Sequence, residues 1–370
     1  MENKIGITLK LLREKLKLSK VKLAKLAKVG VKTIYKLETN RGCSIINIVK
    51  IRNALKKNFN IDLYELSGSK FVWDIEDIDE KSLAIIEGSL LGDGCISQNG
   101  IYTQFAKDKK FLEWLAKVFS EIGLCCNVVP VRSRTSFSSS NAYELYSHTC
   151  PALLLLRRKW YKRNEEKIVK RIPKDIKISG TTLLYWYLGD GNFQRSRRKE
   201  VQKRGRPYIR LYTNDFLRED VELLIEKLKQ IGLRFNTNPK LNKKMKKGYI
   251  LRLGPDDVLK FFKLVGFKPI EEIKNCVTET RNGRIYTFKE KWPTKEDWAK
   301  ILAKTEGIGR ILKERRKELG FTQKELAEKL GIKKHQISEI ECGRKFTHFK
   351  RFKKFLEVLK MDIDNILSKL

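Results

Sequence analysis

The chain has 370 residues and carries 80 Lys and Arg against 44 Asp and Glu, a formal net charge of +36. An excess of this size indicates a polyanionic partner, with nucleic acid as the first candidate and an anionic membrane surface as the second. No apolar run reaches the roughly 20 residues of a membrane span, and the N-terminal residues do not read as a signal peptide, which argues against a membrane protein. We expect a cytoplasmic protein of a prokaryotic cell, associated with the nucleoid.

Cysteine and histidine chemistry finds little support in the sequence. The seven cysteines form no Cys-x-x-Cys pair, and their odd number is typical of reduced thiols inside a cell. None of the three histidines, His148, His335 and His348, has an acidic or thiol partner at the spacing of metal ligands. We therefore expect neither a zinc site nor a histidine-activated nucleophile.

The two ends of the chain carry the same all-helical pattern. Residues 13–38 align without a gap on residues 316–341, with apolar positions at matching places. The repeat predicts one compact helical domain in residues 1–68 and a second in residues 305–370.

Each copy reads as two helices, a tight turn and a third helix. Ser19 and Thr322 stand where a side chain would cap the second helix. Gly331 marks the turn of the second copy, whereas the first copy has Lys28 through Gly30 at that place.

These segments, about residues 4–66 and 306–368, resemble the lambda-repressor/Cro helix-turn-helix family. The resemblance implies that the third helix of each copy enters the major groove of DNA. Lys20 replaces the usual Gln in the first copy, so base reading is expected more firmly of the second; the alternative is that the helices only pack or dimerise. The residues expected at DNA are Lys32 and Tyr35 in the first copy and Lys333, Lys334, His335, Gln336 and Arg344 in the second.

Between the helical domains, an apolar helix twice runs into a Gly-Asp-Gly step, at residues 92–94 and 189–191. A single step of this kind is an ordinary helix stop. Here, however, the same order of predicted elements follows both: two strands, a helix, two strands and a helix. The sequence therefore predicts an α+β core in residues 69–290, built from αββαββα repeats at about 80–175 and 176–275. We expect residues 291–304 to be a linker to the last domain.

The stretches 86–94 and 183–191 resemble the LAGLIDADG signature of homing endonucleases, in the double-motif, single-chain form. The resemblance implies a monomer with an internal pseudo-two-fold axis, at which the motif helices pack and deliver Asp93 and Asp190 to one active site. It also implies a hard divalent cation, Mg²⁺ or Mn²⁺. The ligands expected for that metal are Asp93, Asp190, Gly92 and Gly189.

The two motif helices differ in the size of their side chains. Gly88 and Ser89 leave room for close approach on the first helix, whereas Tyr185 and Trp186 stand at the equivalent place on the second. We therefore expect asymmetric packing, with large residues of the second helix against the small pair of the first.

Further site residues follow from the family pattern. A polar residue after the second strand of each repeat corresponds to Lys107 and Asn214, and a basic residue after the last helix corresponds to Lys268, with Lys162 or Lys167 in the first repeat. The alternative for each lysine is an ordinary solvated side chain.

The strands are expected to form two curved antiparallel sheets that make a saddle over DNA. Alternate side chains along a strand point to the same face, and arginine recognises guanine edges and phosphates. The arginines expected on the DNA face are Arg132, Arg134, Arg195, Arg197, Arg204, Arg206 and Arg210.

The sequence thus favours a site-specific endonuclease that hydrolyses both strands of a long, asymmetric DNA site. Two alternatives remain open: a DNA-binding transcription regulator of the same fold that does not cut, and an RNA-splicing maturase. Retention of both Asp93 and Asp190 favours the nuclease. Intein-type splicing is not expected, because the sequence starts with Met1 and shows no C-terminal His-Asn pair.

Overall fold

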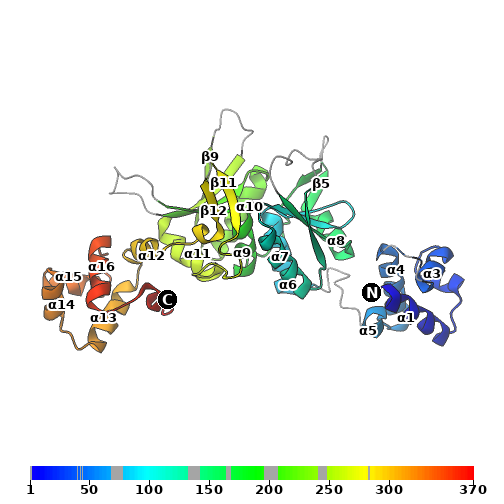
Figure 1. Ribbon diagram of the computed structural model, residues 1–370, viewed down its shortest axis with the longest axis horizontal. Helices are drawn as coiled ribbons and strands as arrows, with labels where there is room; N and C mark the ends of the chain where they lie inside the picture. Colours follow the sequence, from blue (N-terminus) through cyan, green and yellow to red (C-terminus); the bar gives the residue numbers. More distant parts are fainter. Residues whose placement is uncertain are drawn as a thin grey trace. The chain divides into compact units, whose positions relative to one another are not determined.

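The computed structural model describes residues 2–39, 41, 43, 45–67, 78–131, 142–163, 168–195, 207–240, 248–281 and 284–370. These residues fall into two compact units. Unit 1 comprises residues 1–83 and 93–173, and unit 2 comprises residues 84–92 and 174–370. Each unit combines a helical domain with one α+β repeat (Figure 1).

The N-terminal helical domain of unit 1 packs five helices around one apolar core. The core takes Leu9 from the first helix, Leu23 from the second, Ile34 from the third and Leu55 from the fourth, all at most 3% exposed. The helices are α1 (Glu2–Lys15), α2 (Lys20–Leu26), α3 (Val31–Glu38), α4 (Ile45–Phe59) and α5 (Leu63–Ser67).

The turn between α2 and α3 places a lysine in a left-handed conformation. Lys28 has φ of 50°, where the second copy of the domain has Gly331 with φ of 67°. A side chain in this region costs about 1 kcal/mol relative to glycine. We expect Lys28→Gly to stabilise the N-terminal domain by about 1 kcal/mol and Lys25→Gly, within α2, to destabilise it by a similar amount. Hydrogen exchange of the α2 and α3 amides measures both changes, and a loss of stability in Lys28→Gly would contradict this account.

The first α+β repeat begins with the motif helix α6 (Glu80–Leu91), whose last residues belong to unit 2. A four-stranded antiparallel sheet in the order β1-β2-β4-β3 follows, with α7 and α8. A short hairpin, β5–β6, ends the repeat. The bounds are β1 (Cys95–Ile96), β2 (Tyr102–Ala106), α7 (Lys109–Glu121), β3 (Cys126–Pro130), β4 (Tyr143–Ser147), α8 (Pro151–Trp160), β5 (Tyr161–Arg163) and β6 (Ile168–Lys170).

The second repeat has the same topology. Its sheet has the order β7-β8-β10-β9, which is the order of the first sheet, and a hairpin, β11–β12, again follows its last helix. The bounds are α9 (Gly180–Asp190), β7 (Gly191–Gln194), β8 (Tyr208–Thr213), α10 (Arg218–Gln230), β9 (Phe235–Lys240), β10 (Gly248–Leu253), η2 (Pro255–Asp257), α11 (Val258–Val265), β11 (Val277–Arg281) and β12 (Arg284–Thr287). The predicted α+β class and the duplicated αββαββα unit are confirmed.

The residues after β12 lead into the C-terminal helical domain. The 3-10 helix η3 (Phe288–Lys291) and helix α12 (Lys295–Leu302) come first. The domain itself consists of α13 (Ile308–Glu318), α14 (Gln323–Leu330), α15 (Lys334–Glu341), α16 (Phe349–Val358) and α17 (Ile363–Leu367). The third helix expected after the tight turn of this copy is α15.

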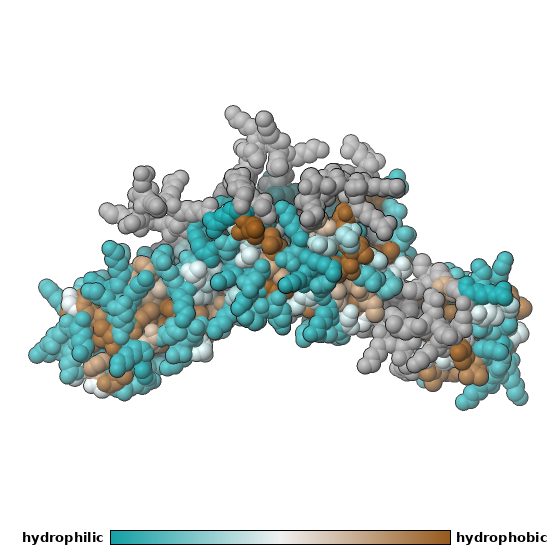
Figure 2. Space-filling model, viewed as in Figure 1, coloured by the Kyte–Doolittle hydropathy of each residue, from teal (hydrophilic) through white to brown (hydrophobic). Residues whose placement is uncertain are grey.

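Hydrophilic side chains cover most of the visible surface of the described residues (Figure 2). Within those same residues, no helix is long and apolar enough to cross a membrane.

Candidate active site and DNA-binding surfaces

The motif helices α6 and α9 approach each other so closely that a side chain has no room at Gly88 and little room at Gly92. A Cβ on Gly88 would lie 2.5 Å from the carbonyl oxygen of Thr182 and 2.9 Å from the Cβ of Tyr185. A Cβ on Gly92 would lie 3.2 Å from the Cα of Gly189. The expected packing of a large residue of the second helix against the small pair is confirmed for Tyr185 and Gly88.

Gly92 and Gly189 lie at the contact of the two helices, and each is directly followed by an aspartate, Asp93 or Asp190. Asp190 is the last residue of α9 and is half-buried, whereas Asp93 is exposed. The described residues contain no group of three His, Cys, Asp or Glu side chains that could hold a metal ion by themselves. A carboxylate oxygen, as each aspartate carries, is a ligand that hard divalent cations take.

Gly191, after the second aspartate, is required by packing and not by its backbone conformation. Its φ of −86° and ψ of 149° are ordinary extended values, so the backbone itself requires no glycine. A Cβ there would instead lie 1.9 Å from the Tyr187 ring. The ring of Tyr187 therefore excludes any larger residue at position 191.

A buried lysine, Lys291, binds the C-terminal end of α9. Its ammonium donates to the carbonyl oxygens of Leu188 at 2.6 Å, Gly189 at 3.0 Å and Tyr187 at 3.2 Å. The hydroxyl of Tyr187 donates in return to the Lys291 carbonyl oxygen. Burial raises the pKa of Tyr187 well above its usual value, against the opposing charge of Arg195, so the hydroxyl keeps its proton for this hydrogen bond.

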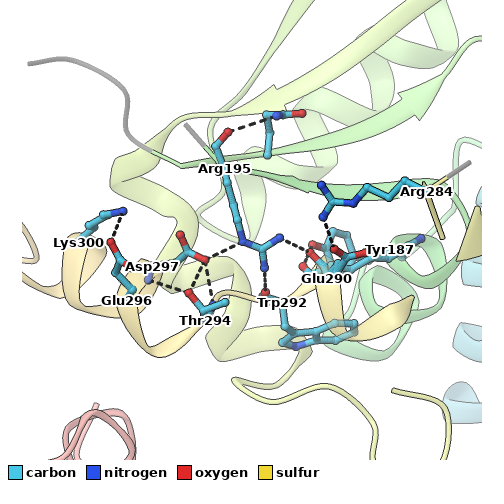
Figure 3. A network of polar contacts seen from close by, with 11 residues as sticks. Tyr187, Arg195, Arg284, Glu290, Trp292, Thr294, Glu296, Asp297 and Lys300 are labelled. Carbon is cyan, nitrogen blue, oxygen red and sulfur yellow. Dashed lines mark hydrogen bonds and ion pairs between the residues drawn. The ribbon is translucent and has the colours of Figure 1, made fainter. Parts of the chain in front are cut away.

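Arg195 binds the segment that carries Lys291 (Figure 3). Its guanidinium donates to the Glu290 carbonyl oxygen at 3.1 Å and to the Trp292 carbonyl oxygen at 2.8 Å, on either side of Lys291. The third contact is the Asp297 carboxylate at 2.9 Å. The structure thus gives Arg195, which we expected at DNA, three partners within the protein.

The stretch 291–304, expected to be a linker, packs as part of unit 2. Trp292 is 2% exposed, its indole donates to the Gly266 carbonyl oxygen at 3.0 Å, and its ring lies 5.5 Å from that of Tyr187. Asp297 closes a capping box with Thr294 at the start of α12. Sequence periodicity gave no sign of the contact between Trp292 and Tyr187, because these two residues lie about a hundred positions apart.

The first motif has comparable support from the end of its own repeat. Lys170, at the end of β6, donates to the carbonyl oxygen of Gly94 at 2.8 Å. The guanidinium of Arg157 donates to the Ile96 carbonyl oxygen, and the Ile96 amide donates to the Tyr161 hydroxyl at 3.0 Å. The strand that follows Asp93 is therefore held by side chains of α8, β5 and β6.

The accessory residues predicted from the family pattern lie in several places. Lys107 and Asn214 are exposed and directly follow β2 and β8, at equivalent points of the two repeats. Lys268 forms an ion pair with Asp364 of α17 at 3.3 Å, so the structure joins it to the C-terminal domain. Lys162 is exposed and donates to the Arg158 carbonyl oxygen, and Lys167 lies outside the described residues.

The second sheet has one apolar and one polar face. Ile209, Leu211 and Thr213 of β8 are buried, and Tyr208, Arg210 and Tyr212 alternate with them on the other face. Arg252 is paired in register with Arg210 across β8 and β10, and both guanidinium groups lie over the Tyr208 ring, at 4.0 Å and 5.1 Å from its centroid. We had not predicted Arg252, although the alternation in β10 puts it on the same face. The other expected arginines, Arg132, Arg134, Arg197, Arg204 and Arg206, lie outside the described residues.

The equivalent face of the first sheet is less basic over its described strands. Thr103 is paired with Tyr146, and the exposed Phe105 is paired with Glu144. Burial raises the pKa of Glu144. The two sheets therefore offer different chemistry to a ligand, which suits an asymmetric site.

Each helical domain has an ion pair that joins its own first and third helices, at the same place in both copies. Arg13 binds Glu38 at 2.6 Å in the N-terminal copy, and Arg316 binds Glu341 at 2.6 Å in the C-terminal copy. The predicted caps Ser19 and Thr322 are both present.

The helix after the turn carries the expected DNA-binding residues in both copies. Lys32 and Tyr35 are exposed on α3, although Lys20 and Arg41 lie over the Tyr35 ring at 5.1 Å and 5.7 Å. In the C-terminal copy the residues at the start of α15 and after it are Lys333, Lys334, His335 and Arg344, all exposed, and the half-buried Gln336.

Three family models match parts of the chain. Residues 83–261 match the LAGLIDADG DNA endonuclease family. Residues 9–61 match a helix-turn-helix model, and residues 309–369 match a helix-turn-helix domain model. An uncharacterized protein of Methanocaldococcus jannaschii is 31% identical over 173 residues, 45% of this chain and 63% of that protein, so the chain spans less than two thirds of this relative.

Several solved structures are similar at low identity. The homing endonuclease I-WcaI bound to its DNA recognition sequence is 20% identical with a TM-score of 0.45, covering 66% of this chain and 98% of that one. I-DmoI in complex with DNA and Mn is 12% identical with a TM-score of 0.30, covering 52% and 97%. The N-terminal LAGLIDADG domain of DUF199/WhiA is 11% identical with a TM-score of 0.34, covering 53% and 86%.

Proposed function

Since residues 83–261 form a LAGLIDADG core between two helix-turn-helix domains, we propose that the protein is a site-specific double-strand DNA endonuclease. The observation that carries the proposal is the contact of Gly92 with Gly189, because an aspartate directly follows each of these glycines. Its substrate would be a long asymmetric DNA site in a prokaryotic cell, where the protein acts as a monomer at the nucleoid.

In this proposal Asp93 and Asp190 hold a divalent cation, Mg²⁺ or Mn²⁺. Bound there, the cation would supply an activated water and a positive charge for the leaving oxygen of an in-line displacement. Oxygen atoms of two carboxylates fit a hard cation of this kind, and a close pair of carboxylates is more easily ionised beside a positive charge. The contribution of the protein is to fix the carboxylates at the ends of two helices that cannot move apart without losing their packing.

DNA recognition is divided among surfaces of different chemistry. Arg210 and Arg252, stacked on Tyr208, offer guanidinium groups held in place for base edges or phosphates. Lys107 and Asn214, near the ends of equivalent strands, are proposed to act on the scissile phosphates or on water. Lys333, Lys334 and His335 are proposed to reach into the major groove from α15.

The decisive experiment incubates the full chain with a randomised duplex library and Mg²⁺ and sequences the ends that form. We expect recurrent double-strand ends at one sequence family, and none in EDTA. A protein that enriches a sequence but leaves every duplex intact would be the non-cleaving regulator, and selective enrichment of structured RNA would indicate a maturase.

Binding to the selected duplex should depend steeply on salt. Each neutralised phosphate adds about −0.9 to the slope of log K against log salt, and the sheets and two helical domains should together neutralise on the order of ten phosphates. Replacing Lys333 and Lys334 together by Gln should flatten the slope by about two units. The matched control replaces Lys317 and Lys354 of the same domain. Equal slopes in wild type and the Lys333/Lys334 variant would show that the start of α15 does not contact DNA phosphates.

A further inference from the structure

Lys291 stands out among the described lysines because all three of its ammonium donors have carbonyl acceptors at one helix end. The side chain is 9% exposed, and the acceptors are the last carbonyls of α9 before Asp190. The carbonyl of Tyr187 also accepts from the Gly191 amide, whereas those of Leu188 and Gly189 lie at the very end of the helix, where carbonyls lack amide partners within it. Together they form the negative dipole end of α9. A buried ammonium there both satisfies the carbonyls and neutralises that end.

The ammonium also changes what the second motif can offer to a metal. A carbonyl oxygen that accepts from a cation at 3.0 Å, as Gly189 does, is a poor ligand for a second cation, because the two positive charges repel at short range inside the protein. The sequence had placed Gly189 among the metal ligands. We propose instead that Lys291 is a positioning residue that fixes the end of α9 and leaves the Asp190 carboxylate as the group that this motif gives to the metal.

The position of Lys291 is itself strongly determined. Tyr187, on the helix that Lys291 binds, donates back to the Lys291 carbonyl oxygen. Arg195 binds the carbonyls of the residues on either side, and the neighbouring Trp292 is buried against Tyr187. The backbone around Lys291 is thus held by four contacts. Its ammonium can therefore fix the position of the end of α9.

The first motif provides an independent comparison. There a lysine from the hairpin that follows α8, Lys170, binds the carbonyl of Gly94, which follows the aspartate instead of preceding it. Both repeats therefore place a lysine from beyond their αββαββα unit on motif carbonyls, but on opposite sides of Asp93 and Asp190. The two aspartates are held differently, so loss of one lysine should affect the two DNA strands unequally.

The inference rests on the proposed endonuclease function, and its test compares Lys291→Met with Lys289→Met in the full chain. Lys289 is exposed and lies two residues away in the same 3-10 helix, so it is a matched control. Hydrogen exchange of the DNA-free protein is measured over residues 187–194. Single-turnover cutting and duplex affinity in EDTA are measured on the site selected from the library.

In Lys291→Met we expect the amides at the end of α9 to exchange about tenfold faster. This factor corresponds to the loss of one charge-assisted hydrogen bond. Cutting should slow by about 10- to 100-fold, as when the support of a metal ligand is removed. Duplex affinity should stay unchanged, and the nicked intermediate should accumulate. Lys289→Met should match wild type in every measurement.

Two results would overturn the inference. Unchanged exchange over residues 187–194 would show that Lys291 does not fix the helix end. A parallel fall of affinity and of cutting on both strands would show a general loss of folding. A wild-type protein that cuts no duplex would refute the endonuclease proposal instead, and the exchange measurement would still decide the role of Lys291.

Discussion

Replacing Asp93 or Asp190 by asparagine is expected to abolish Mg²⁺-dependent double-strand cleavage, lowering the single-turnover rate by about 10³-fold or more, the order of loss for an essential catalytic group. Asparagine keeps the shape of the side chain but removes the charge that holds the cation. Affinity for the selected duplex in EDTA should stay near that of wild type, because neither carboxylate is needed to bind phosphates.

The matched control for these variants is Glu121→Gln, which removes one exposed carboxylate at the end of α7. It should cut at the wild-type rate. If either aspartate variant cut both strands as fast as the Glu121 variant, the assignment of the active site would be wrong.

The second large effect is expected from Gly88→Ala at the contact of the motif helices. The new methyl group would lie 2.5 Å from the carbonyl oxygen of Thr182, a backbone atom that cannot move away as a flexible side chain could. The helices must separate or shift, which should lower the free energy of unfolding by about 1–3 kcal/mol or more. Since Asp190 lies at the end of the displaced helix, cleavage should fall as well.

Gly254→Ala tests whether the effect comes from the contact or from glycine as such. A methyl at Gly254 meets no described atom within 4 Å, and the φ of Gly254, −67°, suits any residue. This variant should unfold and cut like wild type. Denaturant unfolding of both variants measures the difference, and equal stabilities would show that the motif helices tolerate a wider separation than the structure has.

Local chemistry determined much of this protein from the sequence alone. Ser19 and Thr322 mark the beginning of their helices because a side-chain oxygen can accept from a free amide three residues further on. The order of helices and strands in both repeats, and the faces on which Arg210 and Ile209 lie, follow from periodicities of a few residues. The two Gly-Asp-Gly steps could be recognised as a repeat from the sequence because each is a short, contiguous run of residues.

The tertiary structure alone decided which long-range partners each charged side chain takes. Within the protein Arg195 binds Asp297 and two carbonyl oxygens, and Lys268 pairs with Asp364; the roles expected of them at DNA and in the active site stay predictions. Residue 291 was expected in a linker, and Lys291 instead caps α9. A lysine or arginine side chain reaches any acceptor that folding brings near it, so its partner is fixed by the packing of distant elements and leaves no mark in the local sequence pattern.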